Sequence, residues 1–362
     1  MTAVFFCGSP AGRFVGEKGV WVLEMTKRSG ICVAGNLIVD VTYPIERWPR
    51  QSELTTITEG ITRSVGGAVC NVIMDLAKLD SELPLETLGV IGEDPEGEFI
   101  LEQLGAYGNV DVSLLKRMGK TSFTAVMSEN DTKKRTFFQY RGANALFDEA
   151  CVEWDRMNGE ILHVGYILLL DALDQRDEEY GTKMARLLAE ARRHGIRTSI
   201  DVVSETGDRF RTLVPPAMKY TDYCIINELE AQQITGVLLR DEEERLYAEH
   251  MEEALGRMKE LGVSAWAVIH CPEGGYGLDE NGSFVSMNSL RLPEGYIKGT
   301  VGAGDAFCAG VLYGAHKKWS LEESIRLGIC TAAASLSEPG ATEWVGSLED
   351  VMKLEEKFGK KV

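Results

Sequence analysis

Short apolar runs alternate with segments of helical periodicity along most of the chain. Runs typical of strands cover 31–35, 86–91, 160–164, 197–202, 222–226 and 265–270. Segments with apolar residues at helical spacing cover 67–79, 96–107, 179–194, 243–261, 303–318, 320–337 and 347–358, with Ser320 and Ser347 as expected N-caps. This alternation predicts an α/β fold in which helices cover both faces of a mainly parallel sheet.

Two segments interrupt this rhythm. Residues 41–65 are rich in Thr, Ile and charge, and residues 121–141 alternate in the manner of strands. Both are expected to form antiparallel strands outside the main sheet, as a small β-lid made by residues of about 41–65 and 121–144. A lid over the mouth of an α/β domain would exclude water from a reaction site.

Composition limits the functional classes. The 362 residues are 44% hydrophobic and 26% charged, with a net charge of −18. That charge argues against binding to a nucleic-acid backbone or to an anionic membrane, and no apolar run reaches the roughly 18 residues of a membrane span. The 8 cysteines contain no Cys-x-x-Cys pair and are expected to be reduced, which indicates a cytoplasmic protein.

The first 28 residues lack both a clear period and the apolar core of a signal peptide. They are expected to be an N-terminal extension that is disordered or not native, with translation starting at Met25. The remaining residues, 29–358, are expected to form one domain.

The run from Gly299 to Phe307 carries the strongest chemical signal. Gly302, Ala303 and Gly304 precede an apolar helix, so their amide groups would lie at a helix N-terminus, which attracts anions. Asp305 would repel an anion there unless it serves as a general base beside a transferring phosphoryl group. The alternative is an ordinary capped helix start.

Two further signals come from the N-terminal half. Asn36 follows a strand and precedes Asp40 at the edge of the sheet where open α/β folds bind ligands. Gly66 and Gly67 lead into a helix that carries Asn71. Each could also be an ordinary turn, since glycine and Asn are common there.

Two more signals follow later strands. Asn227 and Glu230 lie directly after the strand 222–226, where a carboxylate could organise magnesium through water. Glu273 and Gly275 follow the strand 265–270 and could shape a nucleotide pocket. An acidic first helical turn and a simple hairpin are the respective alternatives.

In this order and spacing, the four signals and the Gly302–Asp305 motif resemble the ribokinase family, the PfkB-type carbohydrate kinases, over residues 30 to 345. The resemblance implies a three-layer α/β/α domain with a β-lid, and transfer of the ATP γ-phosphoryl group to a sugar or nucleoside hydroxyl with Mg²⁺. It implies Asp305 as the base, with Gly302, Ala303 and Gly304 as the anion hole. The other implied contacts are Asn36, Asp40, Gly66, Gly67, Asn71 and Arg141 for the acceptor, Asn227, Glu230, Glu273, Gly275, Thr300 and Gly340 for ATP, and Glu230 for magnesium through water.

This chain departs from the family pattern at one position. Many members carry Asp-Thr where this chain has Gly299 and Thr300, and that Asp contributes to a monovalent-cation site. K⁺ dependence therefore does not follow from the resemblance.

The acceptor stays open at this point. Arg141 could bind a carboxylate or phosphate, or could be an exposed lid residue. A small sugar or sugar derivative is the first choice, and a nucleoside kinase or a catalytically silent sugar-binding or nucleotide-binding regulator are the alternatives. Asp201 is expected at the same mouth. The five histidines show no metal-ligand spacing; His163, which ends an apolar strand, is the one expected near the site, with a satisfied core histidine as the favoured alternative. A homodimer through paired lids is expected if the lid exposes an apolar face.

Overall fold

The computed structural model describes residues 28–132, 134–204, 207–342 and 345–361. It also describes the backbone of two antiparallel strands, β1 (Gly12–Val15) and β2 (Val22–Met25). The rest of the first 27 residues lies outside the described part, so the expectations for this extension and for a start at Met25 stay predictions.

The main sheet of the described chain contains nine strands. Their spatial order is β19 (Phe284–Asn288), β18 (Gly274–Leu278), β17 (Trp266–Cys271), β16 (Tyr223–Asn227), β15 (Arg197–Val202), β12 (Ile161–Ile167), β3 (Ile31–Gly35), β6 (Leu85–Leu88) and β8 (Val110–Asp111). From β17 to β8 in this order, each adjacent pair of strands is parallel. At the other edge, β18 is antiparallel to both β17 and β19. The prediction of a mainly parallel sheet is confirmed.

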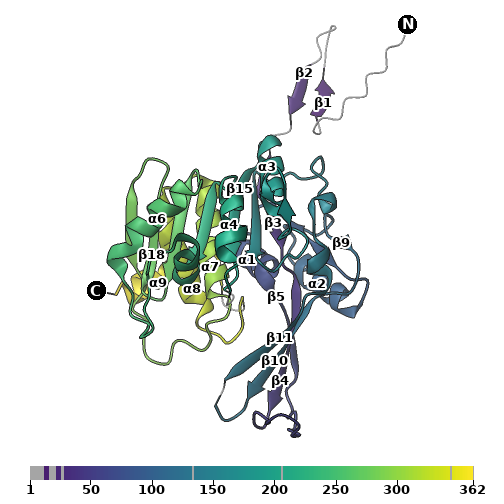
Figure 1. The fold of residues 1–362 in the computed structure, drawn as a ribbon, viewed down its shortest axis with the longest axis vertical. Coiled ribbons are helices and arrows are strands. Elements are labelled where there is room, and N and C mark those ends of the chain that lie inside the picture. The colour runs from purple at the N-terminus through teal and green to yellow at the C-terminus, as the bar shows by residue number, and fades with distance from the viewer. Residues whose placement is uncertain are drawn as a thin grey trace.

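Successive residues of the central strands enter two different cores. Ile31 and Val33 of β3 belong to one apolar cluster, whereas Cys32 and Ala34 belong to the other, because successive side chains of a strand point to opposite faces. The first cluster is covered by α1 (Gly67–Leu79), α2 (Pro95–Gly105), α7 (Ala303–Lys317), α8 (Leu321–Ser335) and α9 (Leu348–Phe358). The second is covered by α3 (Lys183–Arg193), α4 (Phe210–Met218), α5 (Glu228–Thr235) and α6 (Met251–Glu260). The fold therefore has three layers (Figure 1).

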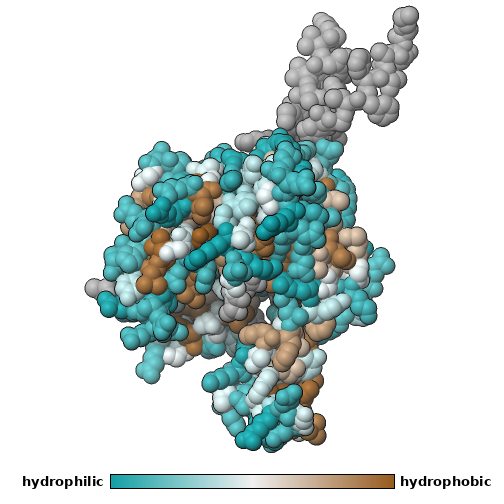
Figure 2. Space-filling model, viewed as in Figure 1, coloured by the Kyte–Doolittle hydropathy of each residue, from teal (hydrophilic) through white to brown (hydrophobic). Residues whose placement is uncertain are grey.

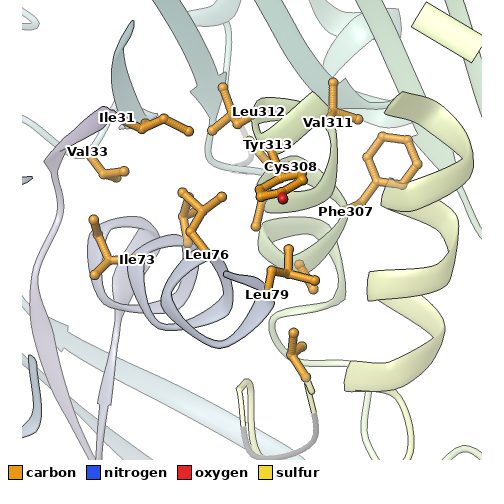
Figure 3. Packing of buried hydrophobic residues seen from close by; sticks show 14 of the residues in the cluster. Ile31, Val33, Ile73, Leu76, Leu79, Phe307, Cys308, Val311, Leu312 and Tyr313 are labelled. Atoms are coloured by element: carbon orange, nitrogen blue, oxygen red, sulfur yellow. The ribbon is translucent and has the colours of Figure 1, made fainter. Parts of the chain in front are cut away.

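Helices α1 and α7 pack side by side on the first face of the sheet. Figure 3 shows Ile73 and Leu76 of α1 lying between β3 and α7, and Leu312 of α7 in the same cluster. These side chains are fully buried. This contact fixes the relative position of the N-termini of α1 and α7. Each N-terminus follows a glycine turn for which a function is predicted.

A second sheet projects from the body as a lid (Figure 1). Its order is β11 (Arg135–Tyr140), β10 (Phe123–Glu129), β4 (Ile38–Ile45) and β5 (Thr62–Gly66). The expectation of an all-antiparallel lid is wrong in one respect, because β10 and β4 run parallel. Both strands leave the body in the same direction, and β11 and β5 return the chain antiparallel to them.

Several predicted boundaries shift. The second lid segment ends at Tyr140 instead of 144, because Gly142–Leu146 forms the 3-10 helix η1. The strand predicted at 86–91 divides into β6 and β7 (Val90–Ile91), and β7 pairs with β9 (Lys116–Arg117). The remaining short elements are β13 (Arg176–Asp177), β14 (Gly181–Thr182), η2 (Glu149–Cys151) and η3 (Ala248–His250).

The expected helices at 179–194 and 243–261 begin later than predicted. Thr182 caps α3 by accepting a hydrogen bond from the backbone of Ala185, so the preceding residues form a hairpin. The sequence did not reveal α4 because Pro215 and Pro216 lie inside it, and proline is a poor indicator of helix.

Candidate active site

The predicted base lies in the first turn of α7. Gly302 is the N-cap in the left-handed region at φ 80°, where glycine is favoured. A Cβ at Gly302 would also lie 2.6 Å from Cβ of Ala341, so the 340–342 loop packs directly on this turn. Glycine is therefore required here for both conformation and space. The amide groups that open α7 are the ones predicted to bind an anion.

The Asp305 carboxylate is buried and held by two donors. Asn71 Nδ2 donates to Asp305 Oδ2 at 2.7 Å, and the Tyr166 hydroxyl donates to the same oxygen at 2.9 Å. Burial raises the pKa of Asp305, while the bonds from Asn71 and Tyr166 lower it. Both bonds fall on Oδ2, and no donor in the described part of the chain bonds to Oδ1, which is left to accept a hydrogen bond.

A cavity of about 240 Å³ opens beside Asp305. Its lining residues are Tyr166, Asp201, Val202, Val203, Ser204, Ile225, Asn227, Glu230, His270, Gly302, Gly304 and Asp305. They come from the carboxyl ends of β12, β15, β16 and β17 and from the start of α7. The structure thus brings the Asn227 and Glu230 pair to the same cavity as Gly302 and Gly304, two residues of the predicted anion hole.

His270 forms the wall of this cavity beside the anion hole. Its ring lies 4.9 Å from the Phe307 ring, and burial lowers its pKa to about 4. A Cβ at Gly304 would lie 3.1 Å from the His270 ring. The neutral ring therefore packs against the glycine turn without adding a charge.

Glu230 is held in a closed hydrogen-bond network. Glu230 Oε2 accepts from the Asn227 backbone at 3.0 Å, and Oε1 accepts from Asn227 Nδ2 at 2.8 Å and from the Ser204 hydroxyl at 2.7 Å. The Asn227 side chain caps α5 in return. Burial raises the pKa of Glu230 to about 7. The network fixes a carboxylate at the cavity wall, which fits the predicted water-mediated magnesium site.

The predicted acceptor residues converge around the start of α1. A Cβ at Gly67 would lie 2.5 Å from the Asn36 carbonyl oxygen, and one at Gly66 would lie 2.3 Å from Asp40 Oδ2. Both glycines therefore permit a close approach. Asn71 follows one helical turn later and reaches Asp305, which joins this group to the cavity.

Buried polar atoms on this acceptor side lack partners. The side-chain oxygen and nitrogen of Asn36, and Oδ1 of Asn71, are buried without a hydrogen bond. Burial also raises the pKa of Asp40 to about 6, although Thr124 donates a hydrogen bond to it. Unpaired buried polar atoms are costly, so these atoms are suited to a polar ligand.

Arg141 does not point to an acidic partner in the cavity. Its guanidinium donates to the Leu168 carbonyl at 3.4 Å and lies 4.0 Å from Asp171. The side chain is one-third exposed, so its role as an acceptor contact or as a lid residue stays a prediction. It borders the loop that follows Tyr166.

Other predicted nucleotide residues lie outside this cavity lining. Glu273 forms an ion pair with Arg240 at 2.8 Å, and a Cβ at Gly275 would lie 2.8 Å from Ile325, so Gly275 serves the packing of the core. The Thr300 side chain is exposed, and its carbonyl accepts from Ala303 at 3.4 Å. Gly340 precedes Ala341 in the loop that packs on Gly302.

Position 299 offers no side-chain ligand for a cation. A Cβ at Gly299 would lie 2.8 Å from the Pro339 carbonyl oxygen and 2.9 Å from that of Glu338. The backbone of the 338–339 segment therefore leaves no room for a carboxylate at 299. The side-chain part of a K⁺ site does not fit this position.

Sequence reasoning missed Tyr166 and Ser204 as site residues. Tyr166 has φ 63°, unusual for a residue other than glycine, and its backbone NH donates to Asp201 Oδ1 at 2.6 Å. One residue therefore holds two carboxylates, through its NH and its hydroxyl. The available signal was position alone, since both residues lie at the end of a buried strand, where α/β folds place ligands.

Comparison with known proteins agrees with this architecture. The model of the pfkB family carbohydrate kinases matches residues 28–345. Ribokinase of Arabidopsis thaliana is 24% identical over 329 residues, covering 90% of this chain and 80% of that protein. The 2-dehydro-3-deoxygluconokinase of Escherichia coli K12 is 25% identical over 299 residues, covering 80% and 93%.

Solved structures show the same fold. Ribokinase from Thermotoga maritima superposes with a TM-score of 0.73 at 18% identity, covering 91% of this chain and 99% of that one. Arabidopsis thaliana ribokinase, solved with ribose and ATP, gives 0.71 at 21% identity, covering 90% and 98%.

Fold and site together define a phosphotransferase with an alcohol group as acceptor. The chain belongs to the pfkB family of carbohydrate kinases. Within the described residues, no helix has the length and apolar character needed to cross a membrane.

Proposed function

We propose that this protein is an ATP-dependent kinase that phosphorylates a hydroxyl of a small sugar or sugar derivative, with Asp305 as the base. The observation that carries the proposal is the buried Asp305 carboxylate at the glycine turn of α7, with Oδ2 held by two donors and Oδ1 left to accept. A held carboxylate beside helix-terminal amides suits in-line phosphoryl transfer.

In this mechanism each group has a limited task. Asp305 orients the acceptor hydroxyl and receives its proton, while the amides of Gly302, Ala303 and Gly304 stabilise charge on the transferring group. Asn227 and Glu230 would hold Mg²⁺ through water, and the ion would offset phosphate charge when bound. Asn36 and Asn71 bind other acceptor hydroxyls through side-chain atoms that lack partners, and the Asp40 carboxyl group lies beside them at Gly66. The lid excludes water from the reaction.

A sugar is favoured over a nucleoside as the acceptor. The acceptor side presents amide and carboxyl groups from Asn36, Asp40 and Asn71, which suit hydroxyls. Among the described lining residues, the aromatic rings are those of Tyr166, whose hydroxyl is engaged with Asp305, and His270, which packs on Phe307. Arg141 directly follows the lid strand β11, so sugars with a carboxylate belong among the acceptors to test. One relative is a 2-dehydro-3-deoxygluconokinase.

The direct test is ADP release with ATP, Mg²⁺ and a panel of neutral sugars, carboxylated sugars and nucleosides. We expect turnover with one sugar, and turnover at least about 100-fold slower with the Asp305→Asn protein. ATP binding without turnover on the whole panel would favour the silent regulator, whereas turnover on nucleosides alone would favour the nucleoside kinase. Near-normal turnover by the Asp305→Asn protein would contradict the assignment of Asp305 as the base.

We also propose pairing of two lids in a homodimer and a reducing, cytoplasmic location. The lid exposes aromatic side chains, with Phe137 57% and Phe138 52% accessible, and Figure 2 shows apolar surface on the lid. A monomeric mass in solution would contradict the dimer.

All seven cysteines in the described part of the chain are free, which agrees with a reducing compartment.

A further inference from the structure

Three buried side chains of metal-binding type meet behind the predicted base. Ligand atoms of His163 on β12, Asp201 on β15 and Cys308 on α7 all lie within 4.8 Å of one another. His163 is fully buried, Cys308 is 1% exposed and Asp201 is 7% exposed. Such residues are uncommon together in a core unless they serve one another or a ligand.

The hydrogen bonds orient these groups toward one point. His163 Nδ1 lies 3.0 Å from the Ser199 hydroxyl, which leaves Nε2, and Nε2 lies 3.7 Å from Cys308 Sγ. A ring nitrogen held by a second residue is the usual arrangement of a metal-binding histidine. Asp201 Oδ1 accepts from the Tyr166 backbone, and no described residue donates to Oδ2.

We propose that His163, Asp201 and Cys308 form a binding site for one zinc-like divalent ion, with water from the adjoining cavity as the fourth ligand. Zinc takes nitrogen, sulfur and oxygen ligands in tetrahedral sites at about 2.0–2.3 Å, so the three atoms need to close slightly around the ion. The thiol loses its proton to solvent and the thiolate donates the electron pair to the metal. The sulfur ligand selects against Mg²⁺, which separates this site from the one proposed at Glu230.

The cavity gives this site both access and a consequence. Asp201 lines the cavity that also contains Asp305 and Tyr166. Asp201 is joined to Asp305 through the NH and the hydroxyl of Tyr166. A positive ion here would favour the charged form of Asp305 and make it a weaker proton acceptor. Occupancy is therefore expected to slow the proposed phosphoryl transfer.

The test measures metal binding without relying on activity. The full chain, freed of metal, is titrated with Co²⁺ and with Zn²⁺ in competition with a chromophoric chelator. We expect one ion per chain and a thiolate-to-cobalt charge-transfer band. The variants His163→Gln and Cys308→Ala should each weaken zinc affinity by at least about 10-fold, the lower end of the loss seen for residues that merely orient ligands. Cys330→Ala is the matched control, since Cys330 is also fully buried but belongs to α8.

The outcomes separate the alternatives. A cobalt complex without a thiolate band, or one unchanged in Cys308→Ala, would overturn the site, as would equal losses in the Cys330→Ala control. Because the cobalt spectrum of the unaltered protein already decides whether a thiolate binds, a variant that fails to fold does not remove the test. Once an acceptor is known, micromolar zinc should inhibit turnover reversibly, and Cys308→Ala should resist it.

Discussion

The two sides of the predicted active site differ in how their polar groups are satisfied. On the phosphate side, Glu230, Asn227 and Ser204 form a closed network in which both oxygens of the carboxylate accept hydrogen bonds. On the acceptor side, both side-chain polar atoms of Asn36 and one of Asn71 are buried without any partner. The first side is complete without a ligand, whereas the second is not.

This difference indicates what each side contributes. A closed network holds a carboxylate in one place, as binding of a hydrated metal requires, and changes little when the ligand leaves. Unpaired buried amides raise the free energy of the ligand-free state, and a sugar hydroxyl would relieve that cost. Specificity for the acceptor should therefore lie with Asn36, Asp40 and Asn71, and the following predictions test this division.

The largest effect is expected at the point where both sides meet. Asp305→Asn keeps the side-chain shape but cannot accept the hydroxyl proton, so kcat should fall about 10²–10⁴-fold. Steady-state kinetics with the identified acceptor measures this change, and circular dichroism should show an unchanged fold. A near-normal kcat would show that another group serves as base.

Asn36→Ala tests the acceptor side. We expect kcat/KM for the acceptor to fall about 10- to 100-fold, the value of one or two lost hydrogen bonds, while KM for ATP is unchanged. Thermal stability should hold, because the Asn36 side chain has no partner to lose.

Asn144→Ala is the matched control for that substitution. Asn144 is also fully buried, but its amide bonds both backbone groups of Leu37, at 3.1 and 2.9 Å. This variant should lose about 1–3 kcal/mol of stability in denaturant unfolding. Equal destabilisation of the two variants would remove the distinction between satisfied and unsatisfied asparagines.

Tyr166→Phe removes the hydroxyl that donates to Asp305. That hydrogen bond lowers the pKa of Asp305, so its loss should move the acidic limb of kcat to higher pH and lower kcat on that limb. A pH profile of kcat compares the variant with the unaltered protein. An unmoved limb would mean that Tyr166 only packs.

The smallest effect is expected on the phosphate side, as a dependence of KM for Mg·ATP on pH. Burial raises the pKa of Glu230 from 4.5 to about 7, so the carboxylate is increasingly protonated below pH 7. KM for Mg·ATP should rise a few-fold as pH falls through 7, and Glu230→Gln should flatten this dependence.

Stability has the opposite sign, because folding favours the protonated form of Glu230. Its contribution is full below pH 4.5 and is lost as pH rises to about 7. Glu230→Gln should therefore flatten that fall in urea unfolding as well, and an unchanged fall would assign it to other groups.

Features that depend on residues close together in the sequence could be predicted, whereas features that depend on distant residues could not. The alternation of apolar runs predicted the parallel sheet, and the glycine turn before Asp305 predicted the helix start, because each depends on neighbouring residues. The parallel β4–β10 pair and the late start of α3 were missed, since long-range pairing and a local hairpin outweigh periodicity there. Glu273 followed a suitable strand, yet Arg240, distant in sequence, engages it.

The sequence by itself determined the order of elements, the glycine turns and the residue types that phosphoryl transfer requires. Only the tertiary structure decided which donors hold Asp305, because Asn71 and Tyr166 lie 234 and 139 residues away from it and no local pattern relates them. The tertiary structure also brings His163 close to Asp201 and Cys308, which lie far from it in the sequence. Strands that are distant in sequence end at the same edge of the sheet, and that edge brings their polar groups within reach of one another.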